Sequence, residues 1–544
     1  MKRNRSIGLR RLGSVLSFAM AMAGCVPATA PPATNTSRLI IAQSREPSAL
    51  NPIFDSGFLN AELSSLVFSY LLGSVRDGEL SADAVRAIPT RANGGISRDG
   101  LTITYHLRPG MRWQDGASLT ASDVLFTYRL IMDPATNVPV RDGFDRIASI
   151  AAPDPLTVRV RLRQLNAPFL LNFLGPQSIT PILPEHLLRG ERDLIRAHFN
   201  TAAIGSGPYR IVSWRRGDRL VLAANPTYFL GMPAIARIEL RFVPNSETQL
   251  NELRTHEVDA IFSADTALYP QLRSLSNLAV TADLIAGFDQ LEFNVHAPIV
   301  SDVRVRTAIA EAIDASVIAA KATHELANAS DAPRGLFAWA YDPAARYPAY
   351  DPAGARRLLD AAGWHPGGDG IRRNRAGERL DVTLALRADI TADQTAGVLI
   401  QAQLRAVGIN LALKTYSGTQ FAAAASEGGP ILGGHFTMEL SAFVVNDDPD
   451  VAWLYSCKTA APVGYNMSGY CDTKTDALME AAVGAIDRVV RKRFLAQVQR
   501  RVATALPLIF LWQTRQVNAF PQNLRNFSVA YDNPYAAVAF WRLR

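Results

Sequence analysis

The chain has 544 residues and a formal net charge of +7, with 56 Lys and Arg against 49 Asp and Glu. The first 24 positions contain five of the basic residues and no acidic one, so the remainder carries 51 basic and 49 acidic side chains. This near-neutral balance, without a basic block interleaved with aromatic residues, argues against a nucleic-acid-binding surface, and the length predicts two or three domains.

Residues 1–24 have the pattern of a signal peptide. A basic segment precedes the apolar run Leu12–Ala23, which is too short to span a bilayer as a mature helix. The end of this run and the two residues after it, Met22-Ala23-Gly24-Cys25, resemble a bacterial lipobox, whose cysteine carries lipid in the mature protein. We therefore expect lipidation of Cys25 and a flexible tether over residues 25–37. Ordinary secretory cleavage beside an incidental cysteine is the alternative.

Short strands and helices alternate along the rest of the chain, which predicts an α/β architecture. Residues 38–43 form the first predicted strand, and period-two alternation predicts half-buried strands at 102–107 and 156–162. We also predict a strand at 381–387 and helices at 302–319, 351–362, 392–406 and 476–504, the last interrupted near Gly484.

Residues 113–133 contain a turn followed by a helix start. Asp115-Gly116 is a turn dipeptide, and Thr120 with Asp123 forms a capping-box pattern. Asp133-Pro134 ends the helical pattern. Apolar residues at helical spacing predict the buried stripe of a surface helix: Val124, Leu125, Tyr128 and Ile131.

Residues 204–212 contain a glycine-rich turn before a strand. Neither a helix N-terminus nor a lysine follows, so the pattern is not that of a phosphate-binding loop. Gly205 and Gly207 instead predict a tight crossing of two chain segments, and Pro208 fixes the start of the strand.

The motif over residues 113–128, W-x-D-G-x-x-[LF]-T-A-x-D-V-x-[FY]-[ST], resembles the signature of the family 5 solute-binding proteins, which feed ABC importers. Residues 204–209 resemble that family's G-[ST]-G-P-[YF] element, and Phe288–Asn294 resembles the strand that crosses into its last lobe. The resemblance covers nearly the whole mature chain. It implies a periplasmic binding protein-like α/β fold of the cluster C type, with three domains and a hinged ligand cleft.

The resemblance also implies the domain boundaries. Domain I is expected to be discontinuous and to comprise residues 38–73, 201–288 and 512–544. Domain II is expected to comprise residues 74–200, and domain III residues 289–511.

The sequence shows no catalytic signature. It contains no G-x-S-x-G elbow, no H-E-x-x-H motif and no Walker loop. The eight histidines are scattered without an i,i+4 pair, so we predict no metal site and no cofactor. We therefore expect that the chain is not an enzyme. An exported hydrolase on a similar scaffold, and a surface adhesin or receptor that has lost its importer, are the alternatives.

Residues 441–450 resemble the ligand loop D-x-x-D-P-D-x-F-L of the peptide binders in this family, whose leading Asp neutralises a peptide's α-ammonium. Val445 stands where that Asp is expected, and Asn446 and Asp447 follow. Either Asp447 takes over the ammonium, or the ligand has no free amino terminus. These three residues and Phe443 form the predicted ligand loop.

Other candidates come from the same resemblance. In the dipeptide-type proteins, an arginine at a place similar to Arg387 pairs with the ligand carboxylate; a solvated strand-end arginine is the alternative. Trp339 and Tyr341 are candidate aromatic walls, or core residues. Cys457 and Cys471 bracket a run that resembles the dipeptide-type binders and supports a disulfide, with two buried thiols as the alternative.

The implied function is that of a substrate-binding lipoprotein, which captures a small solute in an interdomain cleft and delivers it to the permease and ATPase subunits of an ABC importer. A short peptide is the first-choice ligand. An opine, a sugar-phosphate conjugate or a metal chelate stays open because of Val445. We expect a monomer in the periplasm, anchored to the cell membrane by its N-terminal lipid, with no nucleic-acid partner.

Overall fold

The computed structural model describes residues 37–544 except 55–57, 75–79, 137, 139–140, 142, 176–177, 179, 192, 331–336, 445–447 and 531–532. The predicted signal peptide and Cys25 therefore lie outside the described residues. Within the described part, no helix is long and apolar enough to cross a membrane.

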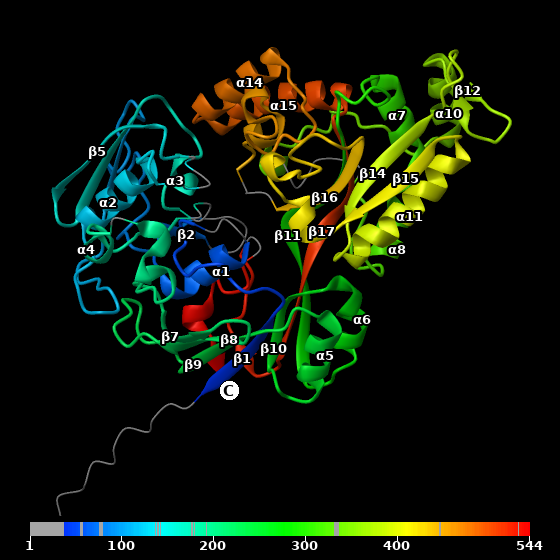
Figure 1. Ribbon diagram of the computed structural model, residues 1–544. Coiled ribbons are helices and arrows are strands. Elements are labelled where there is room, and N and C mark those ends of the chain that lie inside the picture. The colour runs from blue at the N-terminus through cyan, green and yellow to red at the C-terminus, as the bar shows by residue number, and fades with distance from the viewer. Residues whose placement is uncertain are drawn as a thin grey trace, which may run out of the picture. The chain divides into compact units, whose positions relative to one another are not determined.

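A ten-stranded mixed sheet is the largest element of the fold (Figure 1). Its strands hydrogen-bond in the order β15 (Asn410–Tyr416), β14 (Asp381–Arg387), β16 (Met438–Val444), β11 (Leu278–Phe293), β17 (Leu508–Pro521), β10 (Ala260–Ala264), β1 (Arg38–Gln43), β9 (Arg237–Phe242), β8 (Arg219–Ala224) and β7 (Tyr209–Arg215). The first described strand, β1, pairs in parallel with both β9 and β10. The sheet thus joins the beginning, the middle and the end of the chain.

Two long strands, β11 and β17, connect the two ends of this sheet (Figure 1). They pair antiparallel from Leu278 opposite Pro521 to Glu292 opposite Leu508, with register shifts on the way. The sequence predicted a strand only from Phe288 onward, so the prediction was too short. Residues 278–287 include polar residues and a glycine, which weaken the alternation that predicts a strand.

A separate three-stranded sheet contains β4 (Thr102–His106), β6 (Thr157–Leu162) and β5 (Ile147–Asp154), in that order. The predicted strands at 102–107 and 156–162 are thereby confirmed to within a residue. The helix α2 (Ala121–Met132) also matches its prediction, but its buried face differs: Thr127 is buried, whereas Leu125 and Tyr128 are only half-buried.

Helices cover the half of the large sheet that contains β14–β16. The predicted helices at 351–362 and 392–406 correspond to α10 (Pro352–Ala361) and α11 (Thr391–Ala406). The predicted break near Gly484 is confirmed, because α14 (Thr473–Gly484) ends there and α15 (Arg488–Ala505) follows.

The predicted single helix at 302–319 was wrong. The segment forms two helices, α7 (Val303–Ala312) and α8 (Ala315–Ala322). The carboxylate of Asp314 accepts hydrogen bonds from the backbone N–H groups of Ser316 and Val317, and this N-cap starts the second helix. The apolar spacing continues across the junction, which is why the pattern concealed it.

The remaining elements are shorter. They are α1 (Phe58–Val67), β2 (Leu72–Ser74), β3 (Leu80–Ala82), α3 (Phe169–Asn172), α4 (Glu185–Leu188), α5 (Ser246–Arg254), α6 (Tyr269–Arg273), β12 (His365–Pro366), β13 (Arg372–Arg373), α12 (Gly418–Phe421), α13 (Ala452–Tyr455), β18 (Leu524–Arg525), β19 (Arg542–Leu543) and short 3₁₀ turns, of which η5 (Ala338–Ala340) is used below.

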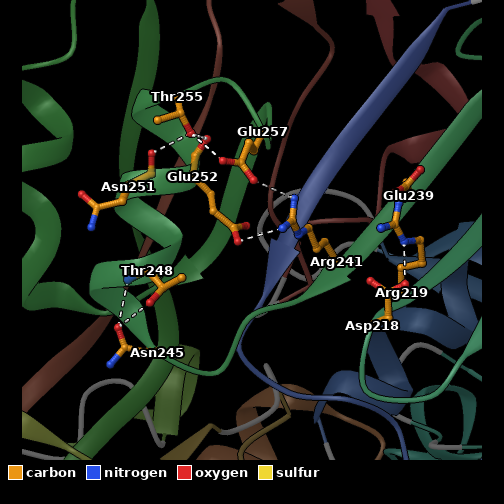
Figure 2. A network of polar contacts seen from close by, with 10 residues as sticks. All are labelled: Asp218, Arg219, Glu239, Arg241, Asn245, Thr248, Asn251, Glu252, Thr255 and Glu257. Atoms are coloured by element: carbon orange, nitrogen blue, oxygen red, sulfur yellow. Dashed lines mark hydrogen bonds and ion pairs between the residues drawn. The ribbon is translucent and has the colours of Figure 1, made fainter.

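A polar network ties α5 to the neighbouring strands (Figure 2). Arg241 on β9 lies 3.1 Å from the Glu252 carboxylate and 3.3 Å from that of Glu257. On the other side of the network, Arg219 forms ion pairs with Asp218 and Glu239. The Arg241–Glu252 pair links α5 to β9, and the Arg219–Glu239 pair links β8 to β9.

Candidate functional site

The two motifs that carry the family resemblance meet at Gln114. Its backbone N–H donates to the carbonyl of Gly205 at 2.9 Å, and its side-chain oxygen accepts the N–H of Gly205 at 3.1 Å. The side-chain amide donates to the carbonyl of Tyr209 at 2.8 Å. The motif at 113–128 therefore holds the start of β7, and its role in this structure is scaffolding.

The same motif fixes the start of α2 through one buried carboxylate. Asp123 accepts hydrogen bonds from the backbone N–H of Thr120 at 2.8 Å and of Glu185 at 3.0 Å. Burial raises the pKa of Asp123, while these hydrogen bonds oppose that rise. The predicted capping role of Asp123 is thus present, and it extends to a second chain segment.

Phe443 lies at the end of β16 in an aromatic cluster. Its ring centroid is 5.1 Å from that of Trp453 and 6.4 Å from that of Phe288. Trp339 and Tyr341 pack against the same hydrophobic core. The three aromatic residues that the sequence predicted to bind the ligand, Trp339, Tyr341 and Phe443, therefore pack against one core. Val445, Asn446 and Asp447 themselves lie outside the described residues.

Asp448 is held by an ion pair that the sequence did not predict. Arg491 on α15 donates to both carboxylate oxygens of Asp448, one at 2.6 Å, and both side chains are at least nine-tenths buried. The Arg491 guanidinium also lies 5.8 Å from the ring centroid of Trp339. Asp448 therefore anchors the loop to α15, because its carboxylate oxygens are already used.

Gln499 positions the segment that carries Trp339 and Tyr341. Its side-chain amide donates to the carbonyl of Ala340 at 3.0 Å, and its side-chain oxygen accepts the backbone N–H of Asp342 at 2.8 Å. Gln499 is fully buried. A buried amide with both of its ends satisfied fixes the backbone between these residues.

Arg387 ends β14, as predicted, and it carries a carboxylate partner. Its guanidinium donates to Asp389 at 3.1 Å and 2.5 Å, and this hydrogen bond holds the pKa of Asp389 below its usual value. Burial, followed by the charge of Asp289, raises the pKa of the nearby Asp393 to about 8. A ligand carboxylate that pairs with Arg387 must therefore compete with Asp389.

A disulfide joins Cys457 and Cys471, as the sequence predicted, with their Cα atoms 4.5 Å apart. Inside the loop, the fully buried Asn466 side chain donates to the carbonyls of Ser456 at 3.0 Å and Tyr470 at 2.7 Å. The backbone N–H of Ser468 donates to Glu292 on β11 at 2.5 Å. The loop is thus held by hydrogen bonds among its own residues and by one hydrogen bond to the large sheet.

Two buried glutamates face each other beneath this loop. Glu292 on β11 and Glu439 on β16 are directly opposite in the antiparallel register, and both are almost completely buried. Burial raises the pKa of Glu439 to about 7. Burial and then the charge of Glu439 raise the pKa of Glu292 well above its usual value. Two carboxylates this close cannot both ionise cheaply, so the pair retains a proton.

Sequence reasoning missed Arg491, Gln499 and the glutamate pair. Arg491 had a detectable signal, because it lies at helical spacing with the buried residues Leu495 and Val498. The two glutamates had no such signal in the sequence, because each has the pattern of an ordinary strand residue until the pairing of the strands is known. Among the described residues, no group of three or more His, Cys, Asp or Glu is placed to hold a metal ion.

The sequence profile of the bacterial extracellular solute-binding proteins, family 5 (Middle), matches residues 88–463. Protein XP55 of Streptomyces lividans is 29% identical over 395 residues, which cover 70% of this chain and 68% of that protein. Oligopeptide-binding protein AppA of Bacillus subtilis (strain 168) is 23% identical over 495 residues, which cover 90% of this chain and 88% of that protein.

Solved structures have the same fold. The structure of Bacillus subtilis AppA in complex with a nonapeptide has a TM-score of 0.81 at 22% identity, over 93% of this chain and 99% of that chain. NikZ from Campylobacter jejuni in complex with Ni(L-His) has a TM-score of 0.81 at 23% identity, with the same coverage.

The fold and the profile match define an extracellular solute-binding protein. The chain belongs to family 5 of the bacterial extracellular solute-binding proteins. Membership implies a peptide or small-molecule ligand, an ABC permease as partner, and a periplasmic or extracellular location. The predicted family and α/β fold are confirmed.

Proposed function

We propose that this protein is a lipid-anchored binding subunit that captures a short peptide between domains I and III and delivers it to an ABC permease. The observation that carries the proposal is the similarity to the oligopeptide-binding AppA, which extends over 90% of the chain. The aromatic cluster at Phe443, next to the ligand loop, supports it, because aromatic walls and a few polar groups suit an enclosed ligand.

The proposal keeps the sequence-derived domain boundaries and a monomeric chain without catalytic activity. The lipid is attached at Cys25, and closure of the lobes around the ligand signals to the importer. Radiolabelled palmitate incorporation tests the anchor: wild-type protein is labelled in its native host, and Cys25→Ser is not. Labelling of the serine variant contradicts the assignment of Cys25.

Arg387 binds the ligand carboxylate in this proposal. Asp389→Asn removes the competing carboxylate and is expected to tighten binding of peptides with a free C-terminus about tenfold, whereas Arg387→Gln weakens it. C-terminally amidated peptides serve as the control, because neither change is expected to alter their affinity. Equal effects on free and amidated peptides contradict the role of Arg387.

A non-peptide solute is the second candidate, and Val445 is the observation that favours it. Calorimetric titration with a pool of di- to pentapeptides, and with the same pool acetylated at its amino termini, separates the possibilities. Binding of both pools means that the ligand needs no free ammonium; binding of the free pool alone favours Asp447 as acceptor. If neither pool binds, native mass spectrometry of protein from its own periplasm identifies the retained solute, and the peptide proposal fails.

A further inference from the structure

A groove of about 720 Å³ runs along one face of α15, with Trp339 from η5 on its other side. Four of the residues that line it are basic: Arg488, Lys492, Arg493 and Arg500. The groove lies outside the aromatic cluster around Phe443, although Trp339 and α15 contribute to both. No step of the proposed solute capture uses it.

Among the described residues, three of the four cations form no ion pair with a carboxylate. Arg500 pairs with Asp342 at 2.8 Å. In contrast, Arg488 stacks on the Trp339 ring at 5.2 Å, and the Lys492 ammonium donates to the Trp339 carbonyl at 3.4 Å. Within the described residues, no carboxylate lies at ion-pair distance from Arg488, Lys492 or Arg493. All three are exposed, and the charges of Arg500 and Lys492 both help to lower the pKa of Asp342. Positive charge therefore exceeds negative charge among the residues that line the groove.

The exposed apolar side chain of Val489 lines the groove, and two further exposed apolar residues are close to it in sequence. Ile486, Val489 and Val490 are 44%, 64% and 40% exposed, at and just before the start of α15. Exposed aliphatic residues beside a stacked indole and a row of cations are typical of contact surfaces with both an apolar and an electrostatic component. A freely solvated basic helix needs no such apolar flank.

The shape favours an extended chain as the occupant. Residues 488 and 492 are one helical turn apart, about 6 Å, and residues 488–500 span about 18 Å. An extended chain rises about 3.3 Å per residue and directs alternate side chains to one face, so its acidic residues at i and i+2 match this repeat. About five residues fill the groove.

We propose that the groove between Trp339 and α15 docks an extended acidic segment of the importer's membrane subunit. The identity of the partner rests on the proposed function, whereas the charge and shape of the segment rest on the groove. The proposal gives Trp339 a docking role in place of the ligand-wall role that the sequence predicted. Glutamate or aspartate side chains at alternate positions pair with the basic residues of the groove, and intervening apolar residues contact Val489.

The test uses the whole protein and a defined probe, the sequence Glu-Val-Glu-Val-Glu inserted inside a carrier protein. The inserted segment has no free terminus, and the attached carrier prevents its enclosure in the ligand cleft. Wild-type protein is expected to bind the probe and not its Gln-Val-Gln-Val-Gln counterpart. The double variant R488E/R493E is expected to bind at least about tenfold more weakly. Trp339→Leu is expected to weaken binding severalfold without a change of charge.

A matched control has the same change in net charge elsewhere. Arg254 and Arg273 are also exposed helical arginines, and Arg273 lies 5.8 Å from the Tyr269 ring, as Arg488 does from Trp339 at 5.2 Å. R254E/R273E is expected to bind the probe within about twofold of wild type. Equal weakening by both double variants shows a general charge effect and overturns the proposal, as does unchanged binding by R488E/R493E.

Two further measurements separate the alternatives. In the first, wild-type protein is mixed with phosphatidylglycerol vesicles. If it binds the vesicles but not the probe, and R488E/R493E does not bind the vesicles, the groove contacts lipid and the proposal is overturned. Loss of solute binding in R488E/R493E assigns the groove to the ligand site and also overturns it. If no peptide pool binds in the cleft but the probe binds in the groove as expected, the proposed ligand fails and the docking surface stands.

Discussion

Gly205 and Gly207 lie where two distant chain segments cross. A Cβ atom at Gly205 would lie 1.8 Å from the carbonyl oxygen of Val67, and one at Gly207 would lie 2.6 Å from its carbonyl carbon. The backbone N–H of Gly207 donates to the same Val67 carbonyl at 2.8 Å. The predicted tight crossing is thus present, and the hydrogen bond holds the segments too close together for any side chain.

Gly205→Ala is therefore expected to destabilise the protein by at least about 3 kcal/mol, because the backbone must move apart and Gln114 loses its contacts. Urea unfolding followed by circular dichroism measures the change. Gly190→Ala is the control, since no atom lies within 4 Å of its added Cβ. A loss below about 1 kcal/mol for Gly205→Ala would show that the crossing can relax.

The Glu292–Glu439 pair makes stability depend on pH. Burial raises the folded pKa of Glu439 from its ordinary value of 4.5 to about 7, so the folded state binds more protons than the unfolded state between these values. The stability from this group is complete below about pH 4.5 and is lost as the pH rises through about 7. The free energy of unfolding of wild type falls as the pH rises through this range, and Glu439→Gln is expected to make that fall smaller by on the order of 2 kcal/mol.

The measurement is the free energy of unfolding at pH 5 and pH 8 for wild type, for Glu439→Gln and for the exposed control Glu427→Gln. Asp83 and Asp393 also have raised pKa values, so the wild-type slope contains their contributions. The difference between variants reports the pair together with the effect of the Glu439 charge on Asp393. Identical slopes in all three proteins would contradict a shared proton.

At the scale of elements, the loop closed by Cys457 and Cys471 connects to the central strands through Ser468 and Glu292. Its buried residues satisfy one another by hydrogen bonds, with Asn466 at the centre. The disulfide restricts the unfolded loop, which spans a separation of 14 residues. The loop is therefore a structural unit that supports one end of β11.

Replacing both cysteines by serine is expected to lower the free energy of unfolding by about 3 kcal/mol in the chain-entropy model. Denaturant unfolding with and without dithiothreitol measures the effect. Reductant should destabilise wild type by a similar amount and leave the serine variant unchanged. Sensitivity of the serine variant to reductant would mean that the effect has another source.

Two helix boundaries show how much local chemistry determines. Asp123 belongs to the capping box of α2 and Asp314 caps α8, and each accepts at least one hydrogen bond from a backbone N–H within three residues. The first cap was recognised because a turn precedes it. The second was missed because apolar residues continue on both sides of Asp314. A capping residue can be recognised from sequence when a turn, and not a continuing apolar pattern, precedes it.

At the scale of the whole molecule, the C-terminal strand β17 occupies a central position. It pairs with β11 on one side and β10 on the other. Beyond it, Trp541 is fully buried and its ring lies 5.6 Å from that of Phe262. The large sheet is therefore incomplete until the last part of the chain has been added.

Deleting residues 508–544 is expected to abolish cooperative unfolding, because β10 and β11 lose their shared neighbour and the core around Phe262 opens. Thermal unfolding followed by circular dichroism tests this. Deleting residues 1–36 is the control and is expected to keep the transition. A cooperative transition in the C-terminal deletion would show that the other strands form a stable sheet alone.

The sequence by itself determined the family, the alternation of strands and helices, the capped helix at 121–132, the close crossing at Gly205 and the disulfide. Each of these depends on residue types within a short span or on one recognisable pair. The resemblance also predicts a ligand loop that includes the valine at position 445. The roles of that loop and the domain boundaries stay predictions.

Only the tertiary structure decided which charged groups pair. Asp448 and Arg491 are 43 positions apart, and Glu292 faces Glu439 across two strands. Arg387 has its partner two residues away, yet the strand-end pattern alone does not show that Asp389 turns toward it. Burial decides whether a charged side chain needs a partner, and burial depends on how distant segments pack, which local patterns do not contain.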